Sequence, residues 1–131
     1  MSHQRILIVD DEPLVLKYAA SVLTRFGYAN VQRASCGLEA RSLLSSQSFA
    51  LVICDFSLPD ADGREILREA LDANPSARGI LITGYSSSDL QIPNDLSEKI
   101  QVLEKPFTAD DISQLVAETF ERSFAETTCA H

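Results

Sequence analysis

Short, wholly apolar runs alternate with longer amphipathic stretches along this chain of 131 residues. The three most apolar runs cover residues 6–9, 50–54 and 80–82, and runs of mixed polarity cover residues 30–34 and 100–103. Strands that alternate with helices favour a parallel sheet that is covered by helices on both faces. The sequence therefore predicts an α/β fold with five strands and five helices.

The polarity of these runs also predicts the order of the strands. A strand buried on both faces should be apolar throughout, whereas an edge strand tolerates polar side chains. We therefore expect the first, third and fourth strands in the centre and the second and fifth at the edges. This agrees with the flavodoxin-like, doubly wound order 2-1-3-4-5, in which ligands bind at the carboxyl ends of the first and third strands.

Helix boundaries are marked by capping and breaking residues. Pro13 suits the first turn of the first expected helix, and Gly27 is expected to end it. Thr108 is expected to cap the last helix, with Asp110 and Asp111 in its first turn, where acidic side chains interact favourably with the helix dipole.

Length and charge limit the organisation of the chain and its partners. We expect one domain over residues 1–124, followed by a short polar tail at residues 125–131. With 19 acidic and 11 basic residues the formal charge is −8, which disfavours binding to nucleic acid or to an anionic membrane surface. No apolar run approaches the roughly 18–20 residues of a membrane span, and no signal peptide is recognisable. We expect a cytoplasmic protein whose three scattered cysteines are free thiols.

Polar residues capable of chemistry follow four of the expected strands. Asp10 and Asp11 follow the first strand, Asp55 the third, Thr83 the fourth and Lys105 the fifth. In the expected sheet these strand ends lie at one edge. Two carboxylates about 4 Å apart repel by roughly 4 kcal/mol at an effective dielectric constant near 20, so a cation is needed to offset them. The lysine supplies one charge, and hard oxygen ligands favour Mg²⁺ or Mn²⁺ for the rest.

An acidic cluster beside a lysine and a hydroxyl group suggests phosphoryl chemistry with a carboxylate as the nucleophile. Each signal taken alone has a local alternative. Asp11 or Glu12 could cap the helix that begins at Pro13, and Asp55 could start a turn. The argument depends on all four signals falling at the same edge of one expected sheet.

Four segments together resemble the receiver domains of bacterial two-component response regulators, a family similar to the chemotaxis regulators. These segments are residues 8–13 (IVDDEP), 51–59 (LVICDFSLP), 82–85 (ITGY) and 103–107 (LEKPF). The resemblance extends from Arg5 to about Phe124 and implies the same doubly wound sheet.

The resemblance implies a metal site and a phosphoacceptor. Asp55 matches the residue that accepts a phosphoryl group from a histidine kinase or a histidine phosphotransfer protein. Asp10 and Asp11 match the acidic pair, with Asp11 a direct Mg²⁺ ligand and Asp10 acting mainly through water. The backbone carbonyl of Ser57 matches a further metal ligand.

The resemblance also implies how a phosphoryl group on Asp55 is sensed. Thr83 matches the hydroxyl residue, and Lys105 the lysine, that contact the phosphoryl oxygens, and the bond from Lys105 to Pro106 is typically cis in such domains. The response is expected on the face formed by the fourth helix, the fifth strand and the fifth helix.

Three features depart from the family pattern. Val102 stands where the family often has an aromatic residue that moves with the threonine. Pro93 lies inside residues 86–98, where the fourth helix is expected, so that helix should be short or broken near Ile92. Glu98 and Lys99 replace a common Gly-Ala pair. The output surface is therefore expected to be unusual. Residues 83–85 (TGY) and 103–107 (LEKPF) are similar to the corresponding segments of receivers attached to hybrid sensor kinases.

Several functions remain open from the sequence. The first is a stand-alone receiver that contacts an unknown downstream protein, and we expect it to be a monomer or a weak dimer. It is not expected to be an enzyme, except in catalysing its own phosphorylation and slow dephosphorylation. The chain could also be the receiver portion of a hybrid sensor kinase. A Mg²⁺-dependent aspartyl-phosphate hydrolase of the haloacid-dehalogenase kind should have an Asp-x-Asp motif, but Glu12 stands at its closing position. A flavodoxin-type cofactor site is rejected, because the acidic residues after the first strand would repel its phosphate.

Overall fold

The computed structural model describes residues 4–84 and 90–129, with side chains as far as residue 121. Along the chain the described elements are β1 Arg5–Val9, α1 Pro13–Arg25, β2 Asn30–Ala34, α2 Gly37–Ser46, β3 Leu51–Asp55, α3 Gly63–Ala73, β4 Arg78–Thr83, β5 Ile100–Glu104 and α4 Ala109–Cys129. All neighbouring strands are parallel, and their order is β2-β1-β3-β4-β5. The predicted flavodoxin-like sheet is confirmed.

Burial explains why the strand order could be read from polarity. The strands β1, β3 and β4 are buried almost throughout, whereas β2 and β5 at the edges keep several partly exposed positions. On β2 the half-buried Gln32 side chain donates a hydrogen bond to Gln47 at 2.6 Å, and on β5 Gln101 is also half-buried. Polar side chains are tolerated at these edges because one side of each edge strand remains open.

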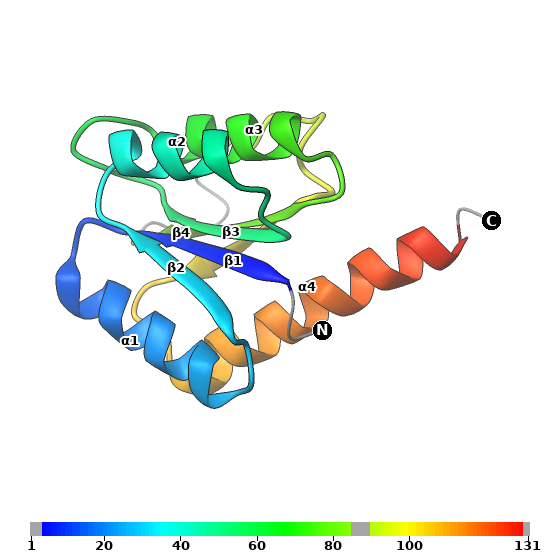
Figure 1. The fold of residues 1–131 in the computed structure, drawn as a ribbon, viewed down its shortest axis with the longest axis horizontal. Helices are drawn as coiled ribbons and strands as arrows, with labels where there is room; N and C mark the ends of the chain where they lie inside the picture. Colours follow the sequence, from blue (N-terminus) through cyan, green and yellow to red (C-terminus); the bar gives the residue numbers. More distant parts are fainter. Residues whose placement is uncertain (1–3, 85–89, 130–131) are drawn as a thin grey trace.

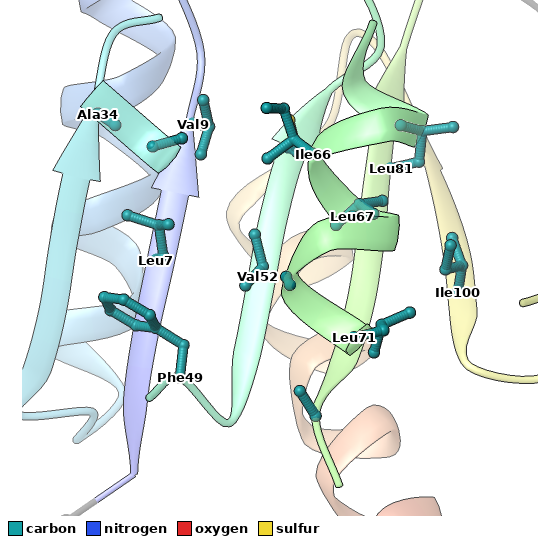
Figure 2. Packing of buried hydrophobic residues seen from close by; sticks show 14 of the residues in the cluster. Leu7, Val9, Ala34, Phe49, Val52, Ile66, Leu67, Leu71, Leu81 and Ile100 are labelled. Atoms are coloured by element: carbon teal, nitrogen blue, oxygen red, sulfur yellow. The ribbon is translucent and has the colours of Figure 1, made fainter. Parts of the chain in front are cut away.

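Two apolar cores lie on the two faces of the sheet. Helices α2 and α3 cover one face, and α1 and α4 cover the other (Figure 1). Figure 2 shows the first core, in which Leu7, Val52 and Leu81 of the sheet and Ile66, Leu67 and Leu71 of α3 belong to one buried cluster. Alternate residues of the same strands, among them Ile8, Ile53 and Ile80, belong to the second core with α1 and α4. The period of two along each strand therefore divides its side chains between the faces.

The predicted helix boundaries at Gly27 and Thr108 are confirmed. Gly27 has a φ of +100°, a left-handed conformation that favours glycine, and it follows the last turn of α1. The Thr108 hydroxyl oxygen accepts a hydrogen bond from the Asp111 backbone N–H at 3.1 Å, and the Thr108 N–H donates to the Asp111 carboxylate at 2.8 Å. This reciprocal pair resembles a capping box and fixes the start of α4. That helix continues to Cys129, beyond the expected end of the domain at residue 124.

The structure has no helix in the described part of residues 86–98, where the fourth of five helices was expected. Residues 85–89 lie outside the described part of the chain, and residues 94–99 form turns. Pro93 has no N–H to donate, and its carbonyl oxygen accepts from Leu96 at 2.9 Å, an i to i+3 bond typical of a turn. A short or broken helix was expected here, and the structure instead has a turn-rich segment in residues 90–99. Among the helices described, none combines the length and apolar character needed to cross a membrane.

Candidate functional site

Three aspartates converge at the carboxyl edge of the sheet, as the strand order predicted. Asp10 follows β1, Asp11 begins the connection to α1, and Asp55 is the last residue of β3. Each offers a carboxylate oxygen, and these oxygens all lie within 4.8 Å of one another. Asp10 is fully buried and Asp55 is 7% exposed, whereas Asp11 faces solvent. The cluster is thus open to an ion or substrate on the side of Asp11.

Lys105 places its ammonium group among these carboxylates. Its Nζ lies 3.4 Å from Oδ2 of Asp10 and 3.5 Å from Oδ2 of Asp55. It also lies 3.3 Å from Oε1 of Glu12. Burial lowers the pKa of Lys105, but the charges of Asp10 and Asp55 and the contact with Glu12 together raise it by more, so the net shift is upward. The lysine therefore stays charged and offsets part of the repulsion in the cluster.

The two buried carboxyl groups are costly to ionise. Burial and then the charge of Asp10 raise the pKa of Asp55 from 3.8 to about 6, although Lys105 and a hydrogen bond from the Ser57 backbone act in the opposite direction. Burial also raises the pKa of Asp10. One lysine thus compensates the cluster incompletely, which leaves room for a further cation.

The oxygen atoms present fit a hard divalent cation. Within the part of the chain that the structure describes, Oδ2 of Asp10 is buried and accepts no well-formed hydrogen bond, although Nζ of Lys105 lies 3.4 Å away. Oxygen ligands without cysteine or histidine favour Mg²⁺ or Mn²⁺ over zinc. A buried carboxylate oxygen without a short hydrogen bond, beside two further carboxylates, offers ligand atoms that suit such an ion.

Thr83 and Lys105 lie next to each other at the ends of β4 and β5. Thr83 is fully buried and is the register partner of Glu104, and its carbonyl oxygen accepts a hydrogen bond from the Lys105 N–H at 2.7 Å. The peptide bond between Lys105 and Pro106 is cis, as the resemblance led us to expect. The structure thus brings Thr83 and Lys105 to the same edge as Asp55.

Ser57 lies in the connection between β3 and α3, two residues beyond Asp55. It is exposed, and it forms an isolated antiparallel bridge with Asp62 near the start of α3. The backbone of Ser57 contributes a hydrogen bond that lowers the pKa of the Asp55 carboxyl group. Ser57 therefore lies beside the aspartate cluster, as expected.

The local alternative for the residues after β1 is not realised. Glu12 is the N-cap residue of α1, but its side chain makes no capping hydrogen bond. Its carboxylate contacts Lys105 instead, and its backbone N–H donates to Oδ1 of Asp10 at 2.9 Å. The side chains of Asp10 and Glu12 therefore make contacts at the carboxyl edge of the sheet and do not cap the helix.

Two further residues support the site and were missed in the sequence. Gly63 begins α3 so close to β3 that an added Cβ would overlap the carbonyl oxygen of Asp55. Asp60 accepts hydrogen bonds from the backbone N–H groups of Gly37 at 2.7 Å and Leu38 at 2.9 Å, so the connection after β3 is held against the start of α2. The Asp62-Gly63 pair could have indicated a tight turn, but Asp60 contacts residues more than 20 positions away, which no local pattern reveals.

A groove of about 520 Å³ opens beside Lys105, between α1 and the residues after β5. Its walls are mostly apolar and are formed by Glu12, Leu14, Val15, Tyr18, Lys105, Pro106 and Phe107. Leu14 is 82% exposed, and the rings of Tyr18 and Phe107 lie 6.2 Å apart between centroids. The aspartate cluster is thus bordered by an accessible apolar surface.

Comparisons with known proteins agree with this geometry. The family model described as the response regulator receiver domain matches residues 6–117. The response regulator receiver protein CpdR of Brucella abortus is 29% identical over 83% of this chain and 90% of its own length. The transcriptional regulatory protein ZraR of Klebsiella oxytoca is 33% identical over 86% of this chain, but the match spans only 25% of ZraR.

Solved structures show the same fold. A CheY-like response regulator receiver domain protein from Methanospirillum hungatei superposes with a TM-score of 0.81 at 28% identity, over 94% of this chain and 98% of that one. The same assignment therefore follows from the strand order, from the edge at which the aspartates meet and from the matched family model. This chain belongs to the response regulator receiver domains, the signalling domains of two-component systems.

Proposed function

We propose that Asp55 accepts a phosphoryl group from a phosphohistidine of a histidine kinase or histidine phosphotransfer protein. A carboxylate oxygen of Asp55 attacks phosphorus, the phosphorus–nitrogen bond breaks, and the imidazole nitrogen leaves and takes up a proton. The observation that carries this proposal is the group of three carboxylates whose oxygens lie within 4.8 Å of one another, with Lys105 3.5 Å from Asp55. A phosphoryl group on Asp55 would bring its oxygens to that ammonium group.

Asp10, Asp11, Asp55 and the backbone carbonyl of Ser57 would hold Mg²⁺, or Mn²⁺ in its place. When bound, the ion supplies positive charge that offsets the negative charge of the transferred phosphoryl oxygens. Asp10 and Asp55 are buried and Asp11 is exposed, so such an ion would be reached from the side of Asp11. This assignment is supported by the buried Oδ2 of Asp10, which accepts no well-formed hydrogen bond from the described residues and lies 3.4 Å from Nζ of Lys105.

Thr83 and Lys105 would hold the phosphoryl oxygens and so sense the modification. Hydrogen bonds to charged groups contribute roughly 1.5–3 kcal/mol each, which is enough to shift a two-state equilibrium by one or more decades. Val102 is half-buried on β5, and its aliphatic side chain does not offer the aromatic ring that is common there in the family. The response would therefore depend on other contacts between the site and the output surface.

The proposed domain acts by contact with a downstream protein and not by turnover of an external substrate. Its formal charge of −8 makes direct binding to nucleic acid unfavourable, and we propose a monomer or weak dimer in the cytoplasm. Catalysis would be limited to the domain's own phosphorylation by a small phosphodonor and its slow reversal. In a longer protein, such as a hybrid sensor kinase, the same domain would pass its signal to the attached parts.

Intact-mass spectrometry after incubation with acetyl phosphate and Mg²⁺ tests this function. We expect one labile phosphoryl group on the wild type, none on Asp55→Asn, and normal incorporation on Asp72→Asn, which alters an exposed aspartate of α3. Omission of the metal should also prevent the modification. Modification of Asp55→Asn to the wild-type extent would contradict the assignment of Asp55. Turnover of the phosphodonor much faster than the slow reversal proposed for this domain would favour a hydrolase.

A further inference from the structure

Three arginines in the layer of α2 and α3 form forked or paired contacts with carboxylates. Arg41 of α2 binds Glu69 of α3 at 2.9 Å. Arg68 of α3 binds both carboxylate oxygens of Asp95, at 2.9 and 3.1 Å. The Arg41 pair joins two helices, whereas the Arg68 pair ties α3 to the turn-rich segment of residues 90–99.

Arg64, one turn before Arg68 on α3, makes contacts of three kinds. Its Nη2 lies 2.7 Å from Oδ2 of Asp62, the residue that caps the same helix. Its Nη1 donates to the carbonyl oxygen of Gln91 at 2.8 Å. Its guanidinium carbon lies 4.9 Å from the centroid of the Phe56 ring, within the range of a cation–π contact. Arg64 therefore joins the connection after β3 to the 90–99 segment.

Phe56 in turn is fixed to the phosphoacceptor. It follows Asp55 directly in the chain, and its N–H donates to the carbonyl oxygen of Ile82 at 2.7 Å. Its own carbonyl oxygen accepts from the N–H of Gly63 at 2.8 Å. The path from Asp55 through Phe56 and Arg64 to Gln91 consists of contacts between neighbours.

We propose that Arg64 is a positioning residue that couples the state of Asp55 to the 90–99 segment; this inference rests on the proposed phosphorylation of Asp55. A phosphoryl group would add negative charge one residue away from the ring on which the guanidinium stacks. The added charge favours a guanidinium turned toward the site over one bound to the Gln91 carbonyl. A ligand shifts a conformational equilibrium only through such differential interactions, and Arg64 supplies one.

The contact of Arg64 with Gln91 lies in the region where this chain departs from the family pattern. The 90–99 segment occupies the place of the expected fourth helix, and Val102 offers no aromatic ring to transmit a change. The segment is held by Arg64 and Arg68 and by the side chain of Leu96, which is buried in the core that α3 covers. A change at Arg64 therefore reaches the segment directly, whereas Arg68 only secures it.

Amide hydrogen exchange without phosphoryl groups provides the first arm of the test. The backbone N–H groups of Leu96, Lys99 and Ile100 bond within or next to the segment and serve as reporters. We expect Arg64→Met and Arg68→Met each to speed reporter exchange about twofold to fivefold, because each removes an exposed charge-assisted contact. Arg41→Met, the matched control, should leave the reporters unchanged. Unaltered reporter exchange in Arg64→Met would overturn the inference.

Saturation with beryllofluoride and Mg²⁺, as a phosphoryl mimic, provides the second arm. In the wild type and in Arg68→Met the mimic should speed reporter exchange, whereas in Arg64→Met it should bind within about threefold of the wild-type affinity and leave the reporters unaffected. Arg64→Lys keeps a charge near Asp62 but has no fork to reach Gln91 as well, so it should lose the response too.

The two arms distinguish failure of the coupling from failure of the proposed function. Binding of the mimic together with a full reporter response in Arg64→Met and Arg64→Lys would overturn the role of Arg64 and leave the phosphoacceptor proposal intact. If the wild type fails to bind the mimic at all, the phosphoacceptor proposal is overturned, and the coupling falls with it. Urea unfolding of each variant checks that the reporters sense the segment and not a general loss of stability.

Discussion

Replacing Asp55 by asparagine should abolish phosphorylation and yet stabilise the metal-free protein. Asparagine has nearly the same shape as aspartate but carries no charge, so it avoids both the burial of a carboxylate and its repulsion by Asp10. Those two causes raise the pKa of Asp55 from 3.8 to about 6. At 1.36 kcal/mol per pKa unit, the ionised side chain costs about 3 kcal/mol more in the folded than in the unfolded protein.

The sign of the pH dependence follows from this upward shift. Between about pH 4 and pH 6 the folded protein binds more protons at Asp55 than the unfolded protein, so wild-type stability falls as the pH rises through this range. The full cost applies above the folded-state pKa and vanishes well below pH 4. The asparagine amide fits Lys105 less well than a carboxylate does, so we expect a gain of about 1–3 kcal/mol at pH 8. This corresponds to a melting temperature roughly 3–12 °C higher.

Urea unfolding in EDTA at several pH values between 4.5 and 8 measures this difference. The gain of Asp55→Asn over the wild type should grow with pH, and Asp72→Asn should show no such trend. Excess Mg²⁺ should then narrow or reverse the difference, because an ion at 100 times its dissociation constant stabilises its binding partner by about 2.7 kcal/mol. An asparagine variant that is less stable than the wild type at pH 8 in EDTA would refute the reasoning about charge burial.

Two other substitutions test the supporting structure. Gly63→Ala should lower the free energy of unfolding by about 2 kcal/mol or more, because the added Cβ would overlap the carbonyl oxygen of Asp55. Gly84→Ala is the control, because its added Cβ meets open space and should change the free energy of unfolding little. Equal effects of the two substitutions in denaturant titrations would disprove this packing argument. Lys105→Met should raise the pKa of Asp55 further in an NMR titration and lower stability at pH 8 by about 1–3 kcal/mol, because the ammonium group near the buried carboxylates is lost. An unchanged or lower pKa of Asp55 would show that Lys105 does not compensate the cluster.

The strand order was predictable because the polarity of each strand's residues indicates how deeply the strand is buried. Gln32 and Gln101 sit on edge strands, and the runs without polar residues became β1, β3 and β4. Convergence of Asp10 and Asp55 then followed from the topology, because the carboxyl ends of parallel strands meet at one edge. The predicted site was therefore a consequence of the fold as much as of the motifs.

Contacts between distant segments could not be predicted in the same way. Glu12 and Lys105 lie 93 positions apart, and the hydrogen bonds from Gly37 to Asp60 and from Arg64 to Gln91 also join a helix to a distant connection. Such contacts depend on loop conformations that no helical or strand periodicity encodes. Pro93 signalled the loss of regular helix, but nothing local indicated that two arginines of α3 would hold the segment in its place.

Paramagnetic line broadening by Mn²⁺ tests most directly whether the three aspartates hold a divalent cation. Substoichiometric Mn²⁺ should first broaden the backbone amide signals around Asp11, Asp55 and Ser57, and excess Mg²⁺ should restore them. Asp11→Asn should weaken the effect at least about tenfold, because one of few charged ligands is lost. Broadening centred on another acidic surface, or an Asp11→Asn variant that binds the ion as the wild type does, would contradict a metal-assisted phosphoacceptor at this edge of the sheet.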